Sequence, residues 1–251
     1  MSSEYSQAFY RAIEPGACQS ASEIVPELIQ RFRPNSVVDV GCGTGSFLSE
    51  FLIQGIKDIC GIDRPDLDRS LLVIPPSAFQ AIDLSRPFNL QRKFDLALCL
   101  EVAEHLDIAC AEDFISSLCN LAPIIIFSAA IPRQVGVHHV NCQWPEYWQE
   151  KFEMRGYQVL DPFRANWISN PRVDWWYAQN TFLAAKPSQS SAEQNPAMFR
   201  SSDRLPSIVH PEHYLRVAQE RAGAFLEIKG IKKDLERLVE KLAIISGPLE
   251  D

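Results

Sequence analysis

The sequence predicts an α/β fold, a parallel sheet with helices on both faces, followed by a C-terminal helical extension. Three observations predict it. Apolar strand-like runs alternate with segments of helical apolar spacing up to residue 186, a polar segment rich in Ser, Gln and Pro follows, and one long helical pattern comes after it. Continuously apolar strands separated by helices are typical of parallel sheets that are buried on both faces.

The elements of the sheet domain are expected in a regular order. Apolar residues at helical spacing predict helices at 21–33, 46–56, 111–121 and 146–157. Continuous apolar runs predict strands at 36–41, 58–63, 78–84, 94–100 and 123–130. The aromatic-rich stretch 173–186 is expected to form a longer strand, antiparallel at the end of the sheet.

The remaining chain is expected to divide into a linker and a helical tail. We assign residues 1–186 to the sheet domain, 187–206 to a linker and 207–251 to the tail. Apolar residues in the tail follow heptad spacing at Ile231, Leu235, Leu238, Leu242 and Ile245, although Gly230 interrupts the register. Two interpretations stay open, a helix that packs back on the domain and a helix that forms a homodimer.

Composition limits the class of protein. The chain has 251 residues, a formal net charge of −8 and a pI near 5.2, and a dedicated nucleic-acid binder would be basic instead. No apolar run reaches the length of a membrane span, and the first residues lack the apolar stretch of a signal peptide. Seven cysteines are scattered singly, which is typical of reduced thiols, so we expect a cytoplasmic protein.

A glycine-rich loop follows the first predicted strand. Gly41, Gly43 and Gly45 lie between that strand and the next helix. Glycine permits positive φ in a tight turn and lets a ligand approach the backbone, while the N–H groups that open the helix favour a polar or anionic group. Asp39 lies inside the apolar strand, where an acid is costly unless it is hydrogen-bonded. The pattern indicates a ligand cradle.

Two further acids end the next strands. Asp63 lies 18 residues after Gly45, where a carboxylate can accept hydrogen bonds from both hydroxyls of a ribose. Asp83, followed by Leu84, lies where an acid could accept from the exocyclic amine of an adenine. Each acid alone is more often an N-cap or a turn residue, but their succession at strand ends favours a nucleoside site.

These motifs resemble a known family. "VVDVGCGTG", "GID" and "AIDL" are similar to the successive cofactor motifs of class I S-adenosylmethionine-dependent methyltransferases, over about residues 20–186. The resemblance implies a Rossmann-like, seven-stranded mixed sheet whose last strand is reversed. It implies S-adenosylmethionine as cofactor, bound by Asp39, Gly41, Gly43, Gly45, Asp63, Asp83 and Leu84.

The residues after the fourth predicted strand are candidates for the chemistry. Glu101, Glu104 and His105 have the i, i+3, i+4 spacing that would put them on one face of a helical turn. Such a group could be half of a divalent-metal site or a general base with its orienting partner. Acids in the first turn of a helix are also favoured by the helix dipole, without any further role.

The ExxEH stretch resembles two branches of the family. In ubiquinone-type O-methyltransferases and small-RNA 2′-O-methyltransferases it contributes to a magnesium site, and the RNA branch adds a histidine after the fifth strand. This chain has His138 and His139 there. Glu101, Glu104, His105 and His139 would suit Mg²⁺ or Mn²⁺ better than zinc, because no cysteine joins them. Alternatively, His105 or His139 is the general base, or the histidines are structural.

We therefore expect an S-adenosylmethionine-dependent methyltransferase that acts on a hydroxyl oxygen of a small molecule or sugar, with Glu101, His105 and His139 as catalytic residues. An aromatic set, similar to a stretch in bacterial proteins of the general methyltransferase-domain type, could stack on a ring-shaped acceptor: Trp144, Tyr147, Trp148, Trp175, Trp176 and Tyr177. The alternatives are a metal-dependent RNA 2′-O-methyltransferase and a non-catalytic, cofactor-binding scaffold that acts through the C-terminal helix.

Overall fold

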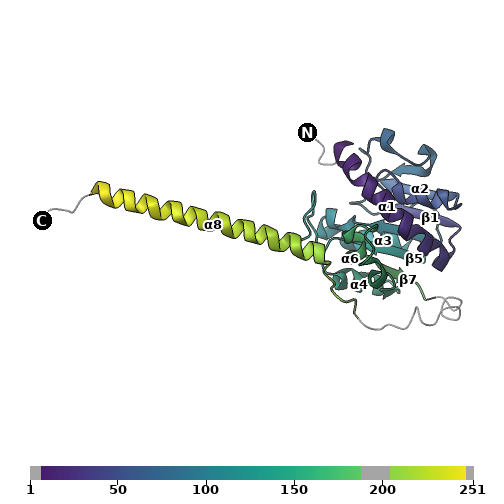
Figure 1. Ribbon diagram of the computed structural model, residues 1–251. Helices are drawn as coiled ribbons and strands as arrows, with labels where there is room; N and C mark the ends of the chain where they lie inside the picture. Colours follow the sequence, from purple (N-terminus) through teal and green to yellow (C-terminus); the bar gives the residue numbers. More distant parts are fainter. Residues whose placement is uncertain (1–6, 188–203, 247–251) are drawn as a thin grey trace. The chain divides into compact units, whose positions relative to one another are not determined.

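The computed structural model describes residues 7–187 and 204–246 of the chain (Figure 1). The chain forms two units, Met1–His210 and Pro211–Asp251. Most of the expected linker, 188–203, lies outside the described residues. Residues 204–210 belong to the first unit, where the backbone N–H of Leu205 donates to Gln149 Oε1 at 2.8 Å.

The first unit contains a seven-stranded sheet of order β3-β2-β1-β4-β5-β7-β6. Neighbouring strands from β3 to β5 are parallel, and β7 is antiparallel to both β5 and β6. The strands are β1 Ser36–Val40, β2 Asp58–Asp63, β3 Phe79–Ala81, β4 Leu96–Leu100, β5 Ile124–Ser128, β6 Gln158–Leu160 and β7 Phe182–Ala185. The predicted mixed sheet with a reversed last strand is confirmed.

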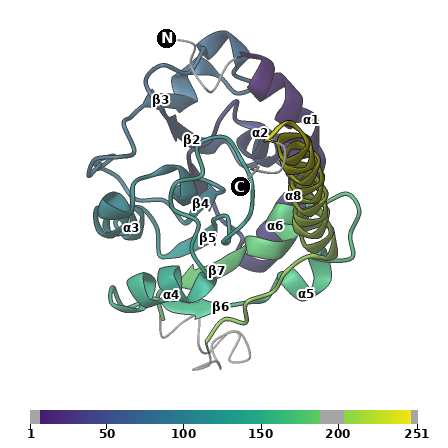
Figure 2. The same cartoon turned by 90° about the vertical axis from the view of Figure 1, so that its left-hand side faces the viewer.

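Helices cover both faces of this sheet (Figure 2). They are α1 Gln7–Phe32, α2 Ser46–Ile53, α3 Ala111–Cys119, α4 Pro145–Glu153, α5 Arg164–Trp167 and α6 Trp175–Asn180, with short 3-10 turns η1 Arg69–Leu71, η2 Pro76–Ala78, η3 Ala103–His105 and η4 Ile108–Cys110. Successive strand residues point to opposite faces, so Ile125 and Phe127 join the core under α3 and α4, whereas Ile126 joins the core under α1 and α2. The continuously apolar strands follow from this burial on both faces.

The stretch 173–186 does not form one long strand, so that prediction was wrong. Trp175–Asn180 is the helix α6, and β7 begins only at Phe182. Aromatic residues favour strands, but this preference is weak and depends on the surroundings. Here Gln179 and Asn180 are fully buried and hydrogen-bonded to side chains elsewhere in the domain, which the helical turn makes possible.

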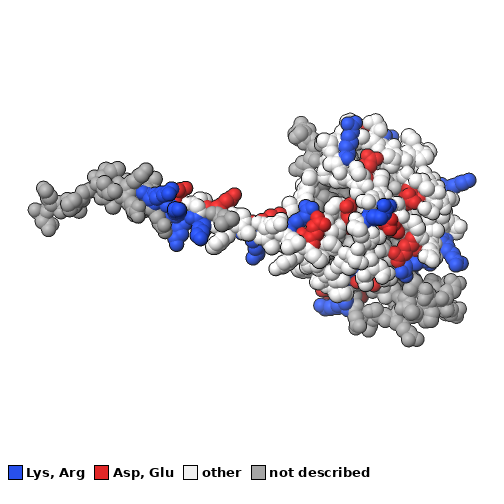
Figure 3. All heavy atoms as spheres, viewed as in Figure 1, with Lys and Arg blue, Asp and Glu red and all other residues white. Residues whose placement is uncertain are grey.

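On the face shown in Figure 3, charges of both signs are interspersed over the first unit. All seven cysteines are free thiols. Among the described residues no helix combines the length and apolar character that crossing a bilayer requires.

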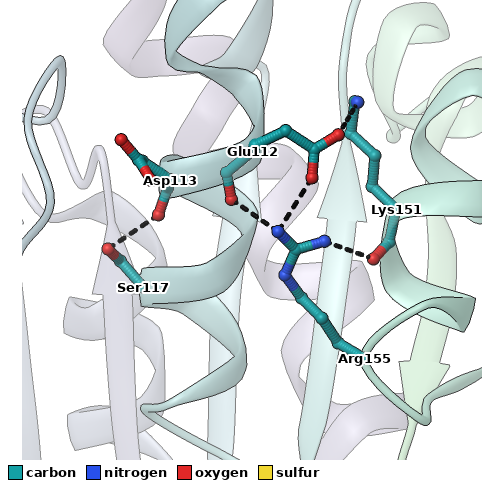
Figure 4. Close-up of polar contacts among 5 residues, drawn as sticks. All are labelled: Glu112, Asp113, Ser117, Lys151 and Arg155. Atoms are coloured by element: carbon teal, nitrogen blue, oxygen red, sulfur yellow. Dashed lines mark hydrogen bonds and ion pairs between the residues drawn. The ribbon is translucent and has the colours of Figure 1, made fainter.

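An ion-pair cluster joins α3 to α4 on one face of the sheet (Figure 4). Lys151 and Arg155 both approach the carboxylate of Glu112, Arg155 Nη2 at 2.9 Å. Arg155 also donates to the backbone carbonyls of Glu112 and Lys151, each at 2.8 Å. Hydrogen bonds from Lys151 and Arg155 lower the pKa of the Glu112 carboxyl. The cluster fixes the two helices that cover this face.

The second unit is the helix α8, Pro211–Ser246, as the sequence predicts for 212–246. Phe225, Ile228 and Ile231 on this helix are about two-thirds exposed. The heptad positions Leu235, Leu238, Leu242 and Ile245 lie within α8, but their side chains are outside the described part of the structure.

Candidate functional site

The glycine-rich loop connects β1 to α2 and needs its glycines. Gly41, Gly43 and Gly45 have φ of +80°, +53° and +91°, a region that favours glycine. A Cβ on Gly41 would lie 2.3 Å from Val102, and one on Gly45 would lie 2.9 Å from Ile74. The loop therefore packs directly against Val102, which follows β4. Its glycines are required both by their positive φ and by the lack of room for a Cβ at Gly41 and Gly45.

Asp63 ends β2 beside this loop. Its Oδ2 accepts the N–H of Gly43 at 2.7 Å, and its Oδ1 accepts the N–H of Arg64 at 2.7 Å. A carboxylate oxygen has two lone pairs, so each oxygen can still accept one hydroxyl. Burial raises the pKa of Asp63, although the two backbone N–H groups act against it.

Asp39 lies on β1 beneath the loop and is almost fully buried. Burial, together with the negative charge of Asp63, raises the pKa of Asp39 to about 8. At neutral pH Asp39 therefore holds its proton for most of the time. The acid that the sequence places inside an apolar strand avoids the cost of a buried charge by staying neutral.

Asp83 and Leu84 follow β3 and have different surroundings. Asp83 Oδ1 accepts from the N–H and the hydroxyl of Ser85, at 3.0 and 2.6 Å, and its Oδ2 lies 3.4 Å from Arg86. Hydrogen bonds from Ser85 lower the pKa of Asp83. Leu84 is buried in the core. Asp83 thus caps its own turn, and Leu84 anchors that turn to the domain.

Glu101 follows β4 in a left-handed conformation, with φ +54°. Its backbone N–H donates to Ser128 on β5, to the carbonyl at 3.1 Å and to the hydroxyl at 3.0 Å. Its carboxylate accepts from Gln134 Nε2 at 2.8 Å and from Asn180 Nδ2 at 3.0 and 3.1 Å. Glu101 precedes the 3-10 turn η3, so it does not share one helical turn with Glu104 and His105 as the spacing suggested.

Glu104 lies in η3 and is completely buried. Among the described residues, no donor lies at close hydrogen-bond distance from either carboxyl oxygen, and the groups that interact with the carboxyl are Glu101 and the backbone N–H groups of Glu104 and Ala130. Burial, and then the negative charge of Glu101, raise the pKa of Glu104 well above its usual value. Its backbone carbonyl accepts from Val140 and Asn141, at 2.9 and 3.0 Å, which holds the loop after β5 against η3.

His105 and His139 meet edge to face, with ring centroids 4.9 Å apart. His139 Nδ1 lies 2.8 Å from the carbonyl oxygen of Gln134, and His105 Nδ1 lies 3.3 Å from that of His138. Because a carbonyl only accepts, Nδ1 of His139 carries the hydrogen and its Nε2 has the lone pair. Burial lowers both histidine pKa values, that of His105 to about 4. Both rings are neutral at pH 7.

Glu104, His105 and His139 form a potential cation-binding group, whose ligand atoms all lie within 4.8 Å of one another. Glu101, the fourth expected ligand, is not part of this group, because its oxygens face the amides of Gln134 and Asn180. His138 is exposed and has a left-handed backbone. The adjacent histidines therefore have different environments: the ring of His139 belongs to the group, and that of His138 does not.

The sequence matches the family model described as a methyltransferase domain over residues 10–223. The chain belongs to this methyltransferase family. Together with the fold, this match makes it a class I S-adenosylmethionine-dependent methyltransferase. The family resemblance found in the cofactor motifs is confirmed.

Solved structures share the fold of this methyltransferase at low sequence identity. The sugar N-methyltransferase KedS8 from Streptoalloteichus sp. is 15% identical, with a TM-score of 0.56, over 72% of this chain and 92% of that one. DesVI from Streptomyces venezuelae is 15% identical, with a TM-score of 0.54, over 72% and 96%. The magnesium protoporphyrin IX methyltransferase from Synechocystis, solved with bound S-adenosylmethionine, is 21% identical, with a TM-score of 0.51, over 73% and 88%. No curated protein sequence matches the chain significantly.

The aromatic set expected near the acceptor separates in this methyltransferase. Trp148 is buried in the core against Phe127, with ring centroids 5.4 Å apart. Tyr177 packs against Phe47 at the start of α2, also 5.4 Å between centroids, and burial, followed by the charge of Glu101, raises the pKa of Tyr177. Trp144 is substantially exposed. Tyr177 thus contacts the start of the helix that follows the glycine loop, while Trp148 fills the core.

Sequence reasoning missed the amide side chains around Glu101. Gln134 follows β5, and Gln179 and Asn180 end α6. All three are buried. Buried amides within an aromatic stretch are a weak sequence signal, and their target lies 33 residues from Gln134 and 79 from Asn180 along the chain.

Proposed function

We propose that this methyltransferase transfers the methyl group of S-adenosylmethionine to a hydroxyl oxygen of a small molecule or sugar. One observation carries the proposal: Val102, which packs against Gly41 of the glycine loop, leads directly into η3, where Glu104 and His105 meet His139. Both groups follow the carboxyl ends of parallel strands, which is where α/β sheets bind ligands. A donor site and a proton-handling site are thereby adjacent.

On the donor side, the glycine loop and the acids that follow the strands would hold S-adenosylmethionine. The free lone pairs of Asp63 suit the two ribose hydroxyls, Gly43 adds no side chain to the loop, and Asp39 lies on β1 just before it. Asp83 and Leu84 would border the adenine. Bound S-adenosylmethionine supplies a methyl group already activated by its sulfonium, so the chain mainly orients the acceptor and removes its proton.

On the acceptor side, His139 is suited to take the hydroxyl proton. Its ring is neutral, its Nδ1 is held by the carbonyl of Gln134, and its Nε2 has the lone pair. As the acceptor oxygen forms its bond to the methyl carbon and the sulfur–carbon bond breaks, the hydroxyl proton passes to Nε2. His105 and Glu101 border this centre and would orient the acceptor.

We also propose a second role for the same group, as an alternative to proton transfer by His139: Glu104, His105 and His139 hold Mg²⁺ or Mn²⁺, and the lone pair on Nε2 of His139 then binds the ion instead of the proton. The donor set fits such an ion, because two histidines direct Nδ1 at backbone carbonyls, as metal-bound histidines commonly do, and among the described residues no donor lies at close hydrogen-bond distance from the Glu104 oxygens. The ion would lower the pKa of a bound hydroxyl.

Removing divalent cations tests this assignment. We expect EDTA to lower the rate of methyl transfer by about 10-fold or more, because the acceptor hydroxyl loses the ion that lowers its pKa. Added Mn²⁺ should restore the rate. Glu104→Gln should lower Mn²⁺ affinity in calorimetry, whereas Glu112→Gln, on the distant α3, should not. A rate that EDTA leaves unchanged would assign the group to proton transfer by His139 alone.

The acceptor class is tested with S-adenosylmethionine labelled on its methyl group. Purified protein is offered hydroxylated ring compounds, sugar nucleotides and short RNA with a free 2′-hydroxyl at its 3′ end. We expect label on an oxygen of a small molecule or sugar. Label on RNA would instead support the second candidate, RNA 2′-O-methylation, which the histidine and glutamate group also suits. Cofactor binding without transfer to any acceptor would favour a non-catalytic scaffold.

We further propose that α8 pairs two copies of the chain. Ile231, the first of the heptad positions, is exposed on α8, as is Ile228, and a helix with an apolar heptad stripe buries that stripe best against a second helix. Light scattering should give a dimer mass for the full chain and a monomer mass for Leu235→Lys/Leu242→Lys. A monomeric full chain would refute the pairing.

We infer that the protein works in the cytoplasm. Seven free thiols, several of them buried, suit a reducing compartment.

A further inference from the structure

A buried chain of amide side chains connects Glu101 with the backbone of the 204–210 segment. Its members are Gln134, after β5, and Gln179 and Asn180, at the end of α6. They are 5%, 0% and 2% exposed. The cofactor and proton-transfer roles proposed above use none of these three side chains, although the backbone carbonyl of Gln134 accepts from Nδ1 of His139.

The direction of these hydrogen bonds is fixed at the end furthest from Glu101. The backbone N–H of His210 can only donate, and it donates to Gln179 Oε1 at 2.8 Å. The nitrogen of the same amide must therefore be the donor on its other side. Gln179 Nε2 donates to Gln134 Oε1 at 3.2 Å and to Asn180 Oδ1 at 2.9 Å.

The amides of Gln134 and Asn180 are oriented by Gln179 and in turn donate to Glu101. Their oxygens accept from Gln179, so their nitrogens face the carboxylate, Gln134 Nε2 at 2.8 Å and Asn180 Nδ2 at 3.0 and 3.1 Å. If one of these amides were rotated by half a turn, its NH₂ group would face another donor, or its oxygen another acceptor. Such a buried, unsatisfied group costs about 1–3 kcal/mol, so the chain has one preferred orientation.

We propose that Gln134, Gln179 and Asn180 are positioning residues that fix the orientation of the Glu101 carboxylate, and that the 204–210 segment sets their direction through the N–H of His210. The role in methyl transfer rests on the proposed function, in which Glu101 borders the acceptor. The coupling between Glu101 and His210 does not depend on the proposed function, because it follows from the hydrogen bonds alone. The segment between the sheet domain and α8 is thereby part of the acceptor site.

The 204–210 segment contains its own control. The N–H of Leu205 also donates to a buried glutamine, Gln149 Oε1, at the same 2.8 Å. Gln149 Nε2 donates to Glu153 on α4 rather than to the chain that leads to Glu101. One amide of the segment is thus coupled to Glu101, and the other is held equally well without that coupling.

Amide hydrogen exchange of the full chain tests the coupling without any acceptor. In Glu101→Ala, the amides that pointed at the carboxylate lose their acceptor and can reorient. We expect exchange of the His210 N–H to become about 10-fold faster or more, because its partner Gln179 is no longer held, while the Leu205 N–H exchanges as in the wild type. No change at His210, or equal acceleration at both positions, would overturn the proposal.

Steady-state kinetics test the consequence for the reaction, with an acceptor found by the labelling experiment. Gln179→Glu keeps the acceptor for His210 but cannot donate to Gln134 and Asn180. We expect kcat to fall by about 10- to 100-fold, the range typical for loss of orienting partners, with the KM of the acceptor and the Kd of S-adenosylmethionine within about twofold. Gln149→Glu should leave kcat within about twofold of the wild type, because Gln149 bonds to Leu205 and Glu153 and not to the amides that orient Glu101.

The possible failures are distinguishable. Equal losses of kcat in both variants, an effect on KM alone, or loss of S-adenosylmethionine binding in Gln179→Glu would show a general structural role and overturn the proposal. A wild-type protein that methylates no acceptor would overturn the proposed function, and the exchange experiment would still decide whether Glu101 and His210 are coupled.

Discussion

Replacing Asp63 by alanine should lower the affinity of the protein for S-adenosylmethionine by about 100-fold or more, since each hydrogen bond to a charged group contributes about 1.5–3 kcal/mol. In the structure each carboxylate oxygen already accepts one backbone N–H, from Gly43 or Arg64, and has a lone pair left for a ribose hydroxyl. The variant loses the two ribose contacts together and frees the loop at Gly43. Isothermal calorimetry of the full chain measures the change.

Asp66→Ala is the matched control for this prediction. Asp66 lies three residues further along the same loop, is exposed and pairs with Arg64. Its loss should leave the Kd within about threefold, as is usual for exposed ion pairs. A Kd for Asp63→Ala that also stayed within threefold would contradict the ribose-binding role.

The same carboxylate predicts a pH dependence of binding. Burial raises the pKa of Asp63 in the cofactor-free protein. A protonated carboxyl accepts hydrogen bonds poorly, so affinity should be highest above this raised pKa. It should fall as the pH decreases through it, at a higher pH than for an ordinary aspartate. Affinity that is constant down to the usual range of aspartate would argue against Asp63 as the group responsible.

His139→Ala should abolish most methyl transfer while it leaves the cofactor bound. Removing a general base lowers rates by about 10²- to 10⁴-fold. Removing a ligand of the proposed cation would have a comparable effect, so the prediction holds for both roles of the group. The Kd of S-adenosylmethionine should stay within about twofold, because His139 belongs to the acceptor side of the site.

The neighbouring histidine provides the comparison. His138 is exposed, and the group of Glu104, His105 and His139 does not include its ring. His138→Ala keeps the backbone carbonyl that faces His105, so kcat should stay within about threefold of the wild type, as for most exposed positions. Equal kcat values for the two alanine variants would contradict the assignment of His139.

Patterns within single segments could be predicted because their causes are local. The apolar runs of β1, β4 and β5 follow from burial on both faces, and the glycines of the loop follow from positive φ at each of them. The stretch 173–186 is the contrary case. Its aromatic composition indicated a strand, but the partners of Gln179 and Asn180 lie on other elements and make this part of it a helix.

The sequence by itself determined the pattern on which the proposed methyl-donor side depends, because the glycines, Asp39 and Asp63 lie at fixed positions relative to strand ends, and the order of strands brings those ends together. Only the tertiary structure decided the acceptor side. It placed His139 beside Glu104 and His105, left His138 exposed, and surrounded the Glu101 carboxylate with amides. The physical reason is distance along the chain. Glu101 meets Gln134 and Asn180 across 33 and 79 residues, and no local pattern records a contact that only the folded sheet brings about.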